Sequence, residues 1–203
     1  MPQTSPRSDG FPMAVVIEGA LALLAVVLAW LFSVPLREQF PRGEALGWGV
    51  VRGLVAAVPM LIVFWWLVHS SRPTFRELRR QVEWLIGEMF PSASIGQLAM
   101  VAVLAGVGEE LLFRGVLQTK LIDWTTPAVG LVLSSLVFGA AHTLSKLYFS
   151  LATLIGLCFG WMAWHYHDLV APIVAHTVYD FVALLYLSRL RLSADSAPPP
   201  ESP

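Results

Sequence analysis

Long apolar stretches recur along the chain and are separated by short polar segments. The first stretch runs from Phe11 to Val34, and the others cover approximately residues 47–68, 95–121, 127–144, 147–164 and 169–187. A helix of about 18 or more apolar residues can cross a hydrocarbon core of about 30 Å. The pattern therefore predicts an all-α, polytopic membrane bundle of about six transmembrane helices.

The segment between the second and third apolar stretches has a different pattern. Apolar residues recur there at helical spacing, and arginines occupy the opposite face. This predicts one basic amphipathic helix, at about residues 74–90, that lies on the membrane surface. Thr74 and Glu77 have the spacing of a capping box, which predicts a helix start at that point.

Composition supports the membrane class. Hydrophobic residues make up 56% of the chain and charged residues only 13%, whereas a soluble domain is about one-quarter charged. The net charge of −1 gives no reason to expect a nucleic-acid partner. Residues 1–10 and 188–203 are polar and contain several prolines, so they are expected to be disordered tails. Residues 11–187 are expected to form a single transmembrane domain.

The charges in the loops predict an orientation. In a bundle of six spans, both termini and the loops after the second and fourth spans share one side. That side carries eight basic residues, namely Arg7, Arg72, Arg76, Arg79, Arg80, Lys146, Arg189 and Arg191. The other side carries three, Arg37, Arg42 and Lys120. The positive-inside rule therefore places both termini in the cytoplasm.

Ionisable residues within the apolar stretches are costly in a membrane and mark candidate functional positions. Glu110 and Arg114 are four residues apart, so they share a helix face and can form an ion pair. Glu109 points about 100° away from Glu110, which leaves it as the freer carboxylate and a candidate general base. Gly106 and Gly108 precede it and would let another helix approach closely.

Two histidine motifs follow in later stretches. Phe138 and His142 share one helix face, and His176 and Asp180 are again four residues apart. Asp180 can accept a hydrogen bond from one imidazole nitrogen of His176 and favour its charged form. Together with Glu109, these groups could activate water and stabilise an oxyanion. Taken alone, each motif is a weak signal, because a single intramembrane histidine more often forms a hydrogen bond between helices and a Glu–Arg pair can simply hold two helices in register. Three such motifs in one small bundle are harder to explain in this way.

Three other polar residues lie near the ends of the expected spans. Glu18, Arg52 and His69 occupy these positions. Side chains near a span end commonly reach towards the interface, so snorkelling or helix packing is the simpler interpretation for them. Cys158 is the sole cysteine, which excludes an intramolecular disulfide and a cysteine metal cluster.

At these motifs the chain resembles the CPBP family, also called ABI or CAAX-protease-like, whose pattern is EExxxR, FxxxH and HxxxN or HxxxD. Here the motifs read EELLFR at residues 109–114, FGAAH at 138–142 and HTVYD at 176–180. The resemblance covers about residues 95–187, which are therefore the expected catalytic core. It implies a glutamate-dependent intramembrane endopeptidase in a bacterial cytoplasmic membrane, with a peptide or protein substrate in or at the lipid bilayer.

The resemblance also implies roles for the residues of the motifs. Glu109 and His142 would activate the attacking water, and His176 with Asp180 would stabilise the tetrahedral intermediate. Eukaryotic CAAX proteases have asparagine where this chain has Asp180. An ionised aspartate cannot donate to an oxyanion, so we expect Asp180 to orient and charge His176, which would be the donor. Glu110, Arg114 and Phe138 complete the motifs as catalytic or substrate-site supporting residues.

Three alternatives remain open at this point. Some descriptions of the family call its members metalloproteases, and Glu109, His142 and His176 could bind zinc with water as a fourth ligand. The sequence lacks HExxH, so a metal is allowed but not indicated. Carboxylates and histidines in a bundle also form proton relays, so a proton-coupled transporter is the strongest rival function. The last alternative is a non-catalytic membrane scaffold.

Overall fold

The computed structural model describes residues 10–195, and its regular structure in that range is entirely helical. In chain order the elements are α1 (Phe11–Leu31), the 3₁₀ helix η1 (Leu36–Gln39), α2 (Glu44–His69), α3 (Pro73–Met89), α4 (Ile95–Glu110), the π-helix η2 (Leu111–Gln118), α5 (Thr119–Trp124), α6 (Pro127–Ala141), α7 (Lys146–Tyr166) and α8 (Val170–Asp195). The expectation of an all-α membrane bundle is confirmed.

Within the described residues, five helical segments are long and apolar enough to cross a membrane. They are Phe11–Leu31, Glu44–His69, Ile95–Trp124, Lys146–Tyr166 and Val170–Leu190. The fourth expected span is shorter than the sequence pattern suggested, because α6 has only 15 residues. At 1.5 Å per residue it is about 22 Å long. Helix α6 ends at Ala141, and the chain turns before α7 begins. Ser145 caps α7 by accepting a hydrogen bond from the backbone N–H of Tyr148 at 3.2 Å.

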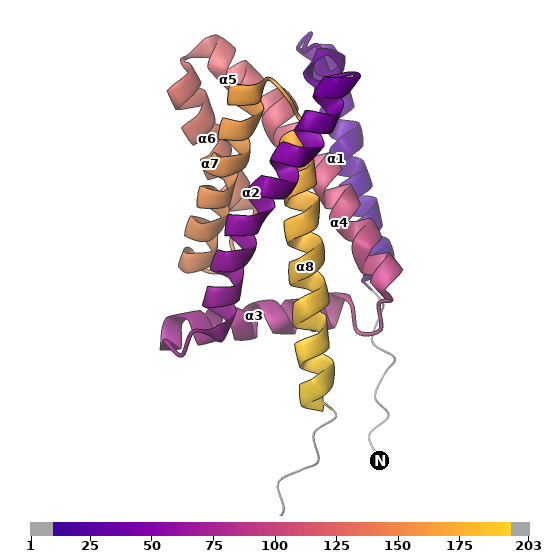
Figure 1. The fold of residues 1–203 in the computed structure, drawn as a ribbon, viewed down its shortest axis with the longest axis vertical. Coiled ribbons are helices and arrows are strands. Elements are labelled where there is room, and N and C mark those ends of the chain that lie inside the picture. The colour runs from indigo at the N-terminus through magenta and orange to yellow at the C-terminus, as the bar shows by residue number, and fades with distance from the viewer. Residues whose placement is uncertain (1–9, 196–203) are drawn as a thin grey trace, which may run out of the picture.

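The bundle is arranged around α8 and α4 (Figure 1). Helix α8 packs against α2 and α4, α1 packs against α4, and α6 pairs with α7. Glycines allow the closest of these contacts, as the sequence predicted. A Cβ atom on Gly106 would collide with Thr177 of α8, and one on Gly108 would lie 2.7 Å from the carbonyl oxygen of Glu18 in α1. Helices α1 and α8 are therefore held closely against the end of α4.

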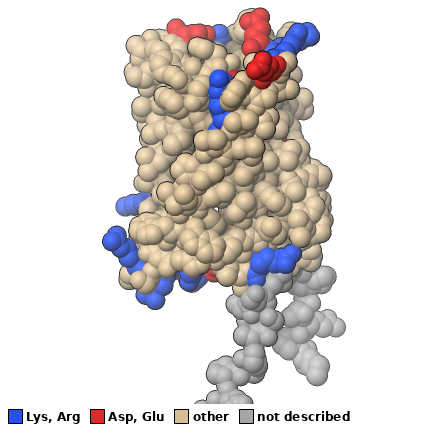
Figure 2. Space-filling model, viewed as in Figure 1, with Lys and Arg blue, Asp and Glu red and all other residues tan. Residues whose placement is uncertain are grey.

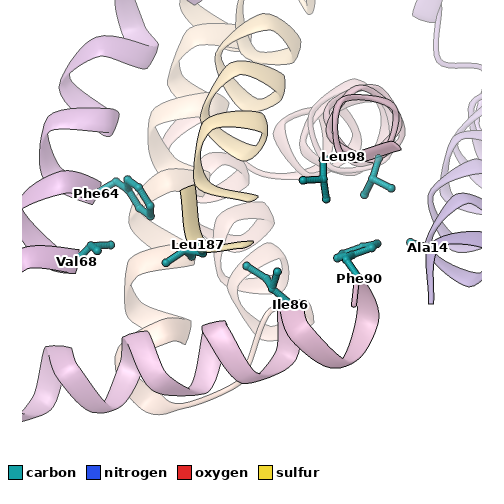
Figure 3. Close-up of a cluster of buried hydrophobic side chains, with 8 residues drawn as sticks. Ala14, Phe64, Val68, Ile86, Phe90, Leu98 and Leu187 are labelled. Carbon is teal, nitrogen blue, oxygen red and sulfur yellow. The ribbon is translucent and has the colours of Figure 1, made fainter. Parts of the chain in front are cut away.

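Helix α3 lies across one end of the bundle, as expected for the amphipathic segment (Figure 1). Its C-terminal part contributes Ile86, and the next turn contributes Phe90, to a buried apolar cluster that also contains Phe64, Leu98 and Leu187 (Figure 3). These contacts come from four different helices and the turn after α3. The apolar stripe of α3 thus faces the bundle and ties its first half to its last helix.

The expected capping box at the start of α3 is wrong. The helix begins with Pro73 at its first position and has no side-chain cap, because proline is suited to that position and Thr74 already lies within the helix. Glu77 instead accepts hydrogen bonds from Arg80 at 2.7 Å and Gln81 at 2.9 Å. The hydrogen bonds from Arg80 lower the pKa of Glu77 to about 2. A capping box does occur in α4, where Ser94 and Gln97 cap each other.

Charged residues separate between the two ends of the bundle. Lys and Arg gather at the end where α3 lies, whereas the opposite end carries both signs of charge (Figure 2). The α3 end includes Arg72, Arg76 and Lys146, which lie at or beside helix termini there. Arg37 and Arg42 lie in the connection between α1 and α2, at the other end. The asymmetry counted along the sequence is thus also an asymmetry in space.

The structure describes part of the expected C-terminal tail. Residues 1–9 and 196–203 lie outside the described residues. Residues 188–195 were expected to belong to the disordered C-terminal tail, but they continue α8 to Asp195. Leucine, arginine and alanine favour a helix, and no proline or glycine interrupts this stretch.

The close contact between α4 and α8 leads to a prediction about stability. Gly106→Ala should destabilise the protein by about 1–3 kcal/mol, because the new methyl group meets Thr177 and the carbonyl of Ile173. Gly96→Ala in the same helix is the matched control, since its Cβ would lie 3.9 Å from the nearest side-chain atom. Thermal unfolding in detergent, followed by tryptophan fluorescence, measures both. Equal melting temperatures for the two variants would contradict the proposed packing.

Candidate active site

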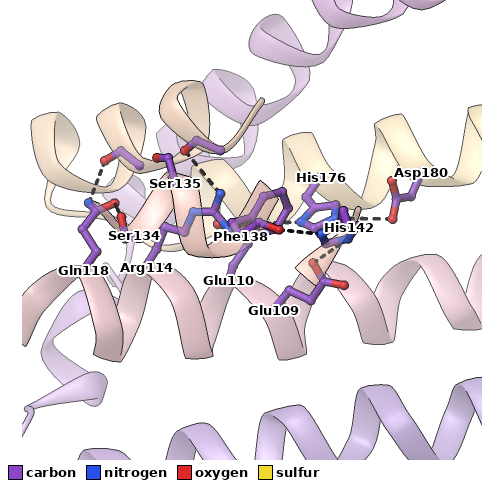
Figure 4. Close-up of polar contacts among 12 residues, drawn as sticks. Glu109, Glu110, Arg114, Gln118, Ser134, Ser135, Phe138, His142, His176 and Asp180 are labelled. Atoms are coloured by element: carbon purple, nitrogen blue, oxygen red, sulfur yellow. Dashed lines mark hydrogen bonds and ion pairs between the residues drawn. The ribbon is translucent and has the colours of Figure 1, made fainter. Parts of the chain in front are cut away.

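The residues that the sequence singled out meet at one place inside the bundle (Figure 4). They come from the end of α4, from η2, from the end of α6 and from α8. The group consists of Glu109, Glu110, Arg114, Phe138, His142, His176 and Asp180. Motifs that lie up to about 70 residues apart in the sequence therefore form a single polar centre.

A buried ion pair forms the innermost part of this centre. Arg114 Nη1 donates to Glu110 Oε1 at 3.0 Å, and its Nη2 donates to the carbonyl oxygen of Gly156 at 3.2 Å. The side chains of Glu110 and Arg114 are 0% and 1% exposed, so water does not screen the pair. The ion pair expected from the four-residue spacing is confirmed. The second hydrogen bond of Arg114, to Gly156 of α7, could not be predicted from the sequence.

Aromatic rings enclose the guanidinium group. The Cζ atom of Arg114 lies 4.1 Å from the ring centroid of Phe138, a distance typical of a cation–π contact. The Phe138 ring meets that of Phe113 edge to face, with centroids 5.2 Å apart, and lies 4.5 Å from the imidazole of His142. Phe138 therefore connects Arg114 with His142 through packing.

The turn that carries Arg114 is a π-helix. It begins immediately after Glu110 and runs to Gln118. π-Helical turns are rare, and they occur often at functional sites because they redirect side chains within a helix. Gln118, which the sequence analysis did not single out, is buried here. It donates to the carbonyl of Gly160 at 2.9 Å and accepts from Ser134 at 3.1 Å. These bonds join η2 to α6 and α7.

His142 and Glu109 face each other across a short gap. The Nδ1 atom of His142 lies 2.9 Å from the carbonyl oxygen of Phe138 and must donate to it, because a carbonyl only accepts. The Nε2 atom then points towards Glu109 Oε2 at 3.5 Å. This distance allows an ion pair but is too long for a good hydrogen bond. Glu109 Oε2 is buried and has no hydrogen-bond partner among the described residues.

His176 lies between two carboxylates. Its Nδ1 is 2.8 Å from Glu110 Oε1, and its Nε2 is 3.3 Å from Asp180 Oδ2. Carboxylate oxygens accept hydrogen bonds, so this arrangement favours a proton on both nitrogens and hence a charged ring. The contact with Asp180 confirms the expected pairing. The contact with Glu110 was not expected, and it shows that Glu110 holds His176 as well as Arg114.

Glu18 also belongs to this neighbourhood, and the snorkelling interpretation of it is wrong. Its carboxyl interacts electrostatically with Glu109, Asp180, His176 and His142. Its Oε2 atom is buried without a hydrogen-bond partner among the described residues. Glu18 lies seven residues after Phe11, the first residue of α1, which is about 10 Å along the helix. Its side chain is therefore too deep to reach the membrane interface at the N-terminal end of α1. The signal available in the sequence was a carboxylate within an apolar run.

The arrangement of these residues does not fit the zinc site that the sequence left open. Glu109 and His142 lie together, but both ring nitrogens of His176 already face carboxylate oxygens. A histidine ligand needs a free lone pair on one nitrogen. No group of three His, Cys, Asp or Glu side chains within residues 10–195 is arranged to hold a metal ion. The geometry therefore does not fit zinc on Glu109, His142 and His176.

Comparison with known proteins gives a family match in the segment that carries the motifs. Residues 91–182 match the family model described as Type II CAAX prenyl endopeptidase Rce1-like. The chain is 37% identical over 98 residues to the uncharacterized protein YpbD of Bacillus subtilis, an alignment that covers 47% of this chain and 48% of that protein. It is 32% identical over 98 residues to a protein of Aromatoleum aromaticum named glycerol-3-phosphate acyltransferase, covering 48% and 50%. The matches thus span about half of each relative. No solved structure matches the chain.

The buried ion pair gives the second prediction. Arg114→Met should destabilise the protein by about 3–5 kcal/mol, because it leaves the Glu110 carboxylate in an apolar interior without its strongest partner. The double variant Glu110→Gln, Arg114→Met should recover part of this loss, since no unpaired charge remains. Thermal unfolding of the wild type, both single variants and the double variant in detergent completes the cycle. Additive losses would show that the two residues do not stabilise each other.

Proposed function

Since residues 91–182 of this chain match the Rce1-like family model, we propose that the protein is an intramembrane endopeptidase that hydrolyses a peptide bond with water activated by Glu109 and His142. The observation that carries the proposal is the pair of facing atoms, His142 Nε2 and Glu109 Oε2, at 3.5 Å. In the proposed reactive state His142 is neutral: its Nδ1 donates to the carbonyl of Phe138, and its Nε2 presents a lone pair beside the carboxylate of Glu109. Two acceptors cannot bond directly, but a water molecule can donate one O–H to each.

The same water is the nucleophile in the proposed reaction. Glu109 takes one proton as the water oxygen attacks the carbonyl carbon of the scissile bond, and a tetrahedral oxyanion forms. The proton then passes to the leaving nitrogen as the C–N bond breaks. The products are a carboxylic acid and an amine, and Glu109 returns to its starting state. His142 orients the water, and the carbonyl of Phe138 fixes the orientation of His142.

His176 is the proposed donor to the oxyanion. Its Nδ1–H is directed at Glu110, so the N–H available to a substrate is the one on Nε2. That group faces Asp180 at 3.3 Å, the longer of the two contacts, and the Asp180 side chain is 30% exposed. A substrate carbonyl oxygen could displace this carboxylate and accept from His176, whose charge Glu110 would continue to support. Asp180 therefore holds and charges His176 until the substrate arrives.

The substrate is proposed to be a peptide or protein segment in or at the bilayer. The most exposed groups of the centre are the side chains of His142 and Asp180, at 27% and 30%, whereas Glu109 and His176 are 9% and 5% exposed. A peptide would therefore approach past His142 and Asp180. Phe138 contacts Arg114 and His142, and its ring is the proposed support for the bound peptide.

The first functional prediction concerns Glu109. Glu109→Gln should reduce cleavage of a peptide substrate by about 10²–10⁴-fold, because an amide cannot accept the proton of water, while the melting temperature stays close to that of the wild type. Glu77→Gln, on the exposed face of α3, is the control and should remain active. Cleavage of a prenylated CAAX peptide and of a membrane-peptide library by reconstituted protein is followed by mass spectrometry.

The same preparations distinguish the rival functions. Proton flux or solute uptake that depends on Glu109, without cleavage, would favour a transporter, and the absence of both would favour a scaffold. Transfer of an acyl group to glycerol 3-phosphate, the activity in the name of the Aromatoleum relative, is measured alongside. Acyl transfer that is lost in Glu109→Gln, without peptide cleavage, would overturn the proposal.

We also propose that the basic end of the bundle faces the cytoplasm. Two single cysteines in a Cys158→Ala background test this orientation: Arg76→Cys on α3, and Arg42→Cys in the connection between α1 and α2. In intact spheroplasts a membrane-impermeant maleimide should label Arg42→Cys only. Arg76→Cys should be labelled after the membrane is permeabilised, because the positive-inside rule places α3 inside. The reverse pattern would place the α3 end outside.

A further inference from the structure

We propose that Glu18 is a positioning residue for this reaction: a neutral carboxylic acid on α1 that donates a hydrogen bond to the Glu109 carboxylate, directly or through the attacking water. The proposal rests on the proposed function of Glu109. Glu18 lies outside residues 91–182, the segment that matches the family. The proposed active site would then require a helix that precedes the matched segment.

The backbone of α1 places Glu18 beside the reacting groups. A Cβ atom on Gly108 would lie 2.7 Å from the carbonyl oxygen of Glu18 and 3.4 Å from the backbone nitrogen of Ala22. Helix α1 therefore contacts α4 at the residue immediately before Glu109. From this position, the Glu18 carboxyl is within electrostatic range of Glu109, His142, His176 and Asp180, and its strongest charge interaction is with Glu109.

The cations of the centre are already engaged by other carboxylates. Arg114 pairs with Glu110, His176 lies between Glu110 and Asp180, and His142 faces Glu109. Glu18 Oε2 is buried without a hydrogen-bond partner among the described residues. A buried carboxylate without a cation is strongly disfavoured, so the group takes up a proton instead. In that form it becomes a hydrogen-bond donor.

The matching acceptor is Glu109. Its Oε2 atom is buried and also lacks a hydrogen-bond partner among residues 10–195, whereas the Oδ2 atom of Asp180 is directed at His176. A hydrogen bond from Glu18 would hold Glu109 in the orientation that faces His142. It would also keep these two interacting carboxyl groups at a single negative charge, since two carboxylates within electrostatic range in an apolar interior repel each other.

Two substitutions at Glu18 separate this role from a packing role. Glu18→Leu should lower kcat by about 10- to 100-fold, the loss of one hydrogen bond to a charged group, with KM almost unchanged because the residue does not contact the substrate. Glu18→Gln keeps an N–H donor and should recover most of the lost turnover. Gly19→Leu is the control on the same helix, since nothing lies within 4 Å of its Cβ position. Leucine favours a membrane helix, so insertion is retained.

Each outcome decides the proposal. Wild-type kcat in Glu18→Leu would overturn it, as would a Glu18→Gln protein as slow as Glu18→Leu, which would show that an ionised carboxylate is needed. Infrared spectroscopy provides a readout independent of cleavage: the carbonyl band of a protonated carboxyl should be present in the wild type and absent from Glu18→Gln. If the band is present in the wild type and absent from Glu18→Gln, but neither the wild type nor any variant cleaves peptides, the proposed function is wrong and the protonated state of Glu18 is right. If the band is unchanged, the assignment of Glu18 is wrong.

Discussion

The Glu110 carboxylate is the group on which the arrangement of the centre depends. It accepts hydrogen bonds from Arg114 in the adjoining π-helix and from His176 on α8, and it is completely buried. In an apolar interior, each of these three groups would be strongly disfavoured without the others. Arg114 in turn reaches the backbone of α7 at Gly156 and contacts Phe138 of α6. Four helical segments besides α4, namely η2, α6, α7 and α8, are therefore positioned by contacts that lead back to one buried carboxylate.

The helices of the bundle and most residues of this polar network could be predicted from the sequence. The membrane class, the surface helix and the Glu110–Arg114 and His176–Asp180 pairs follow from periodicity and four-residue spacing, because both express the geometry of a single helix. The contact between His176 and Glu110 joins two helices, and spacing along one helix says nothing about such a contact. For the same reason, Glu18 was misinterpreted: its depth was visible in the sequence, but the face of α1 that meets α4 was not.

The errors in helix boundaries also have physical causes. The apolar run at residues 127–144 suggested a full span, but His142 bonds back to Phe138 and the chain turns before α7. The π-helix after Glu110 has no sequence signature of its own, since its residues would equally well form an α-helix. At the C-terminus, the prolines after residue 197 suggested a disordered tail from residue 188 onwards. Residues 188–195 precede these prolines and continue α8.

The length of α6 affects the lipid around it. A helix of about 22 Å is shorter than the hydrocarbon thickness of a typical bilayer, about 30 Å. Lipid beside a short helix thins to match it, at a modest energetic cost per ångström. We expect the bilayer to be depressed beside α6, where the helix ends and His142 begins the turn to α7. The headgroup region would there come closer to the bundle centre, and this would shorten the path that a polar peptide and water must take through hydrocarbon.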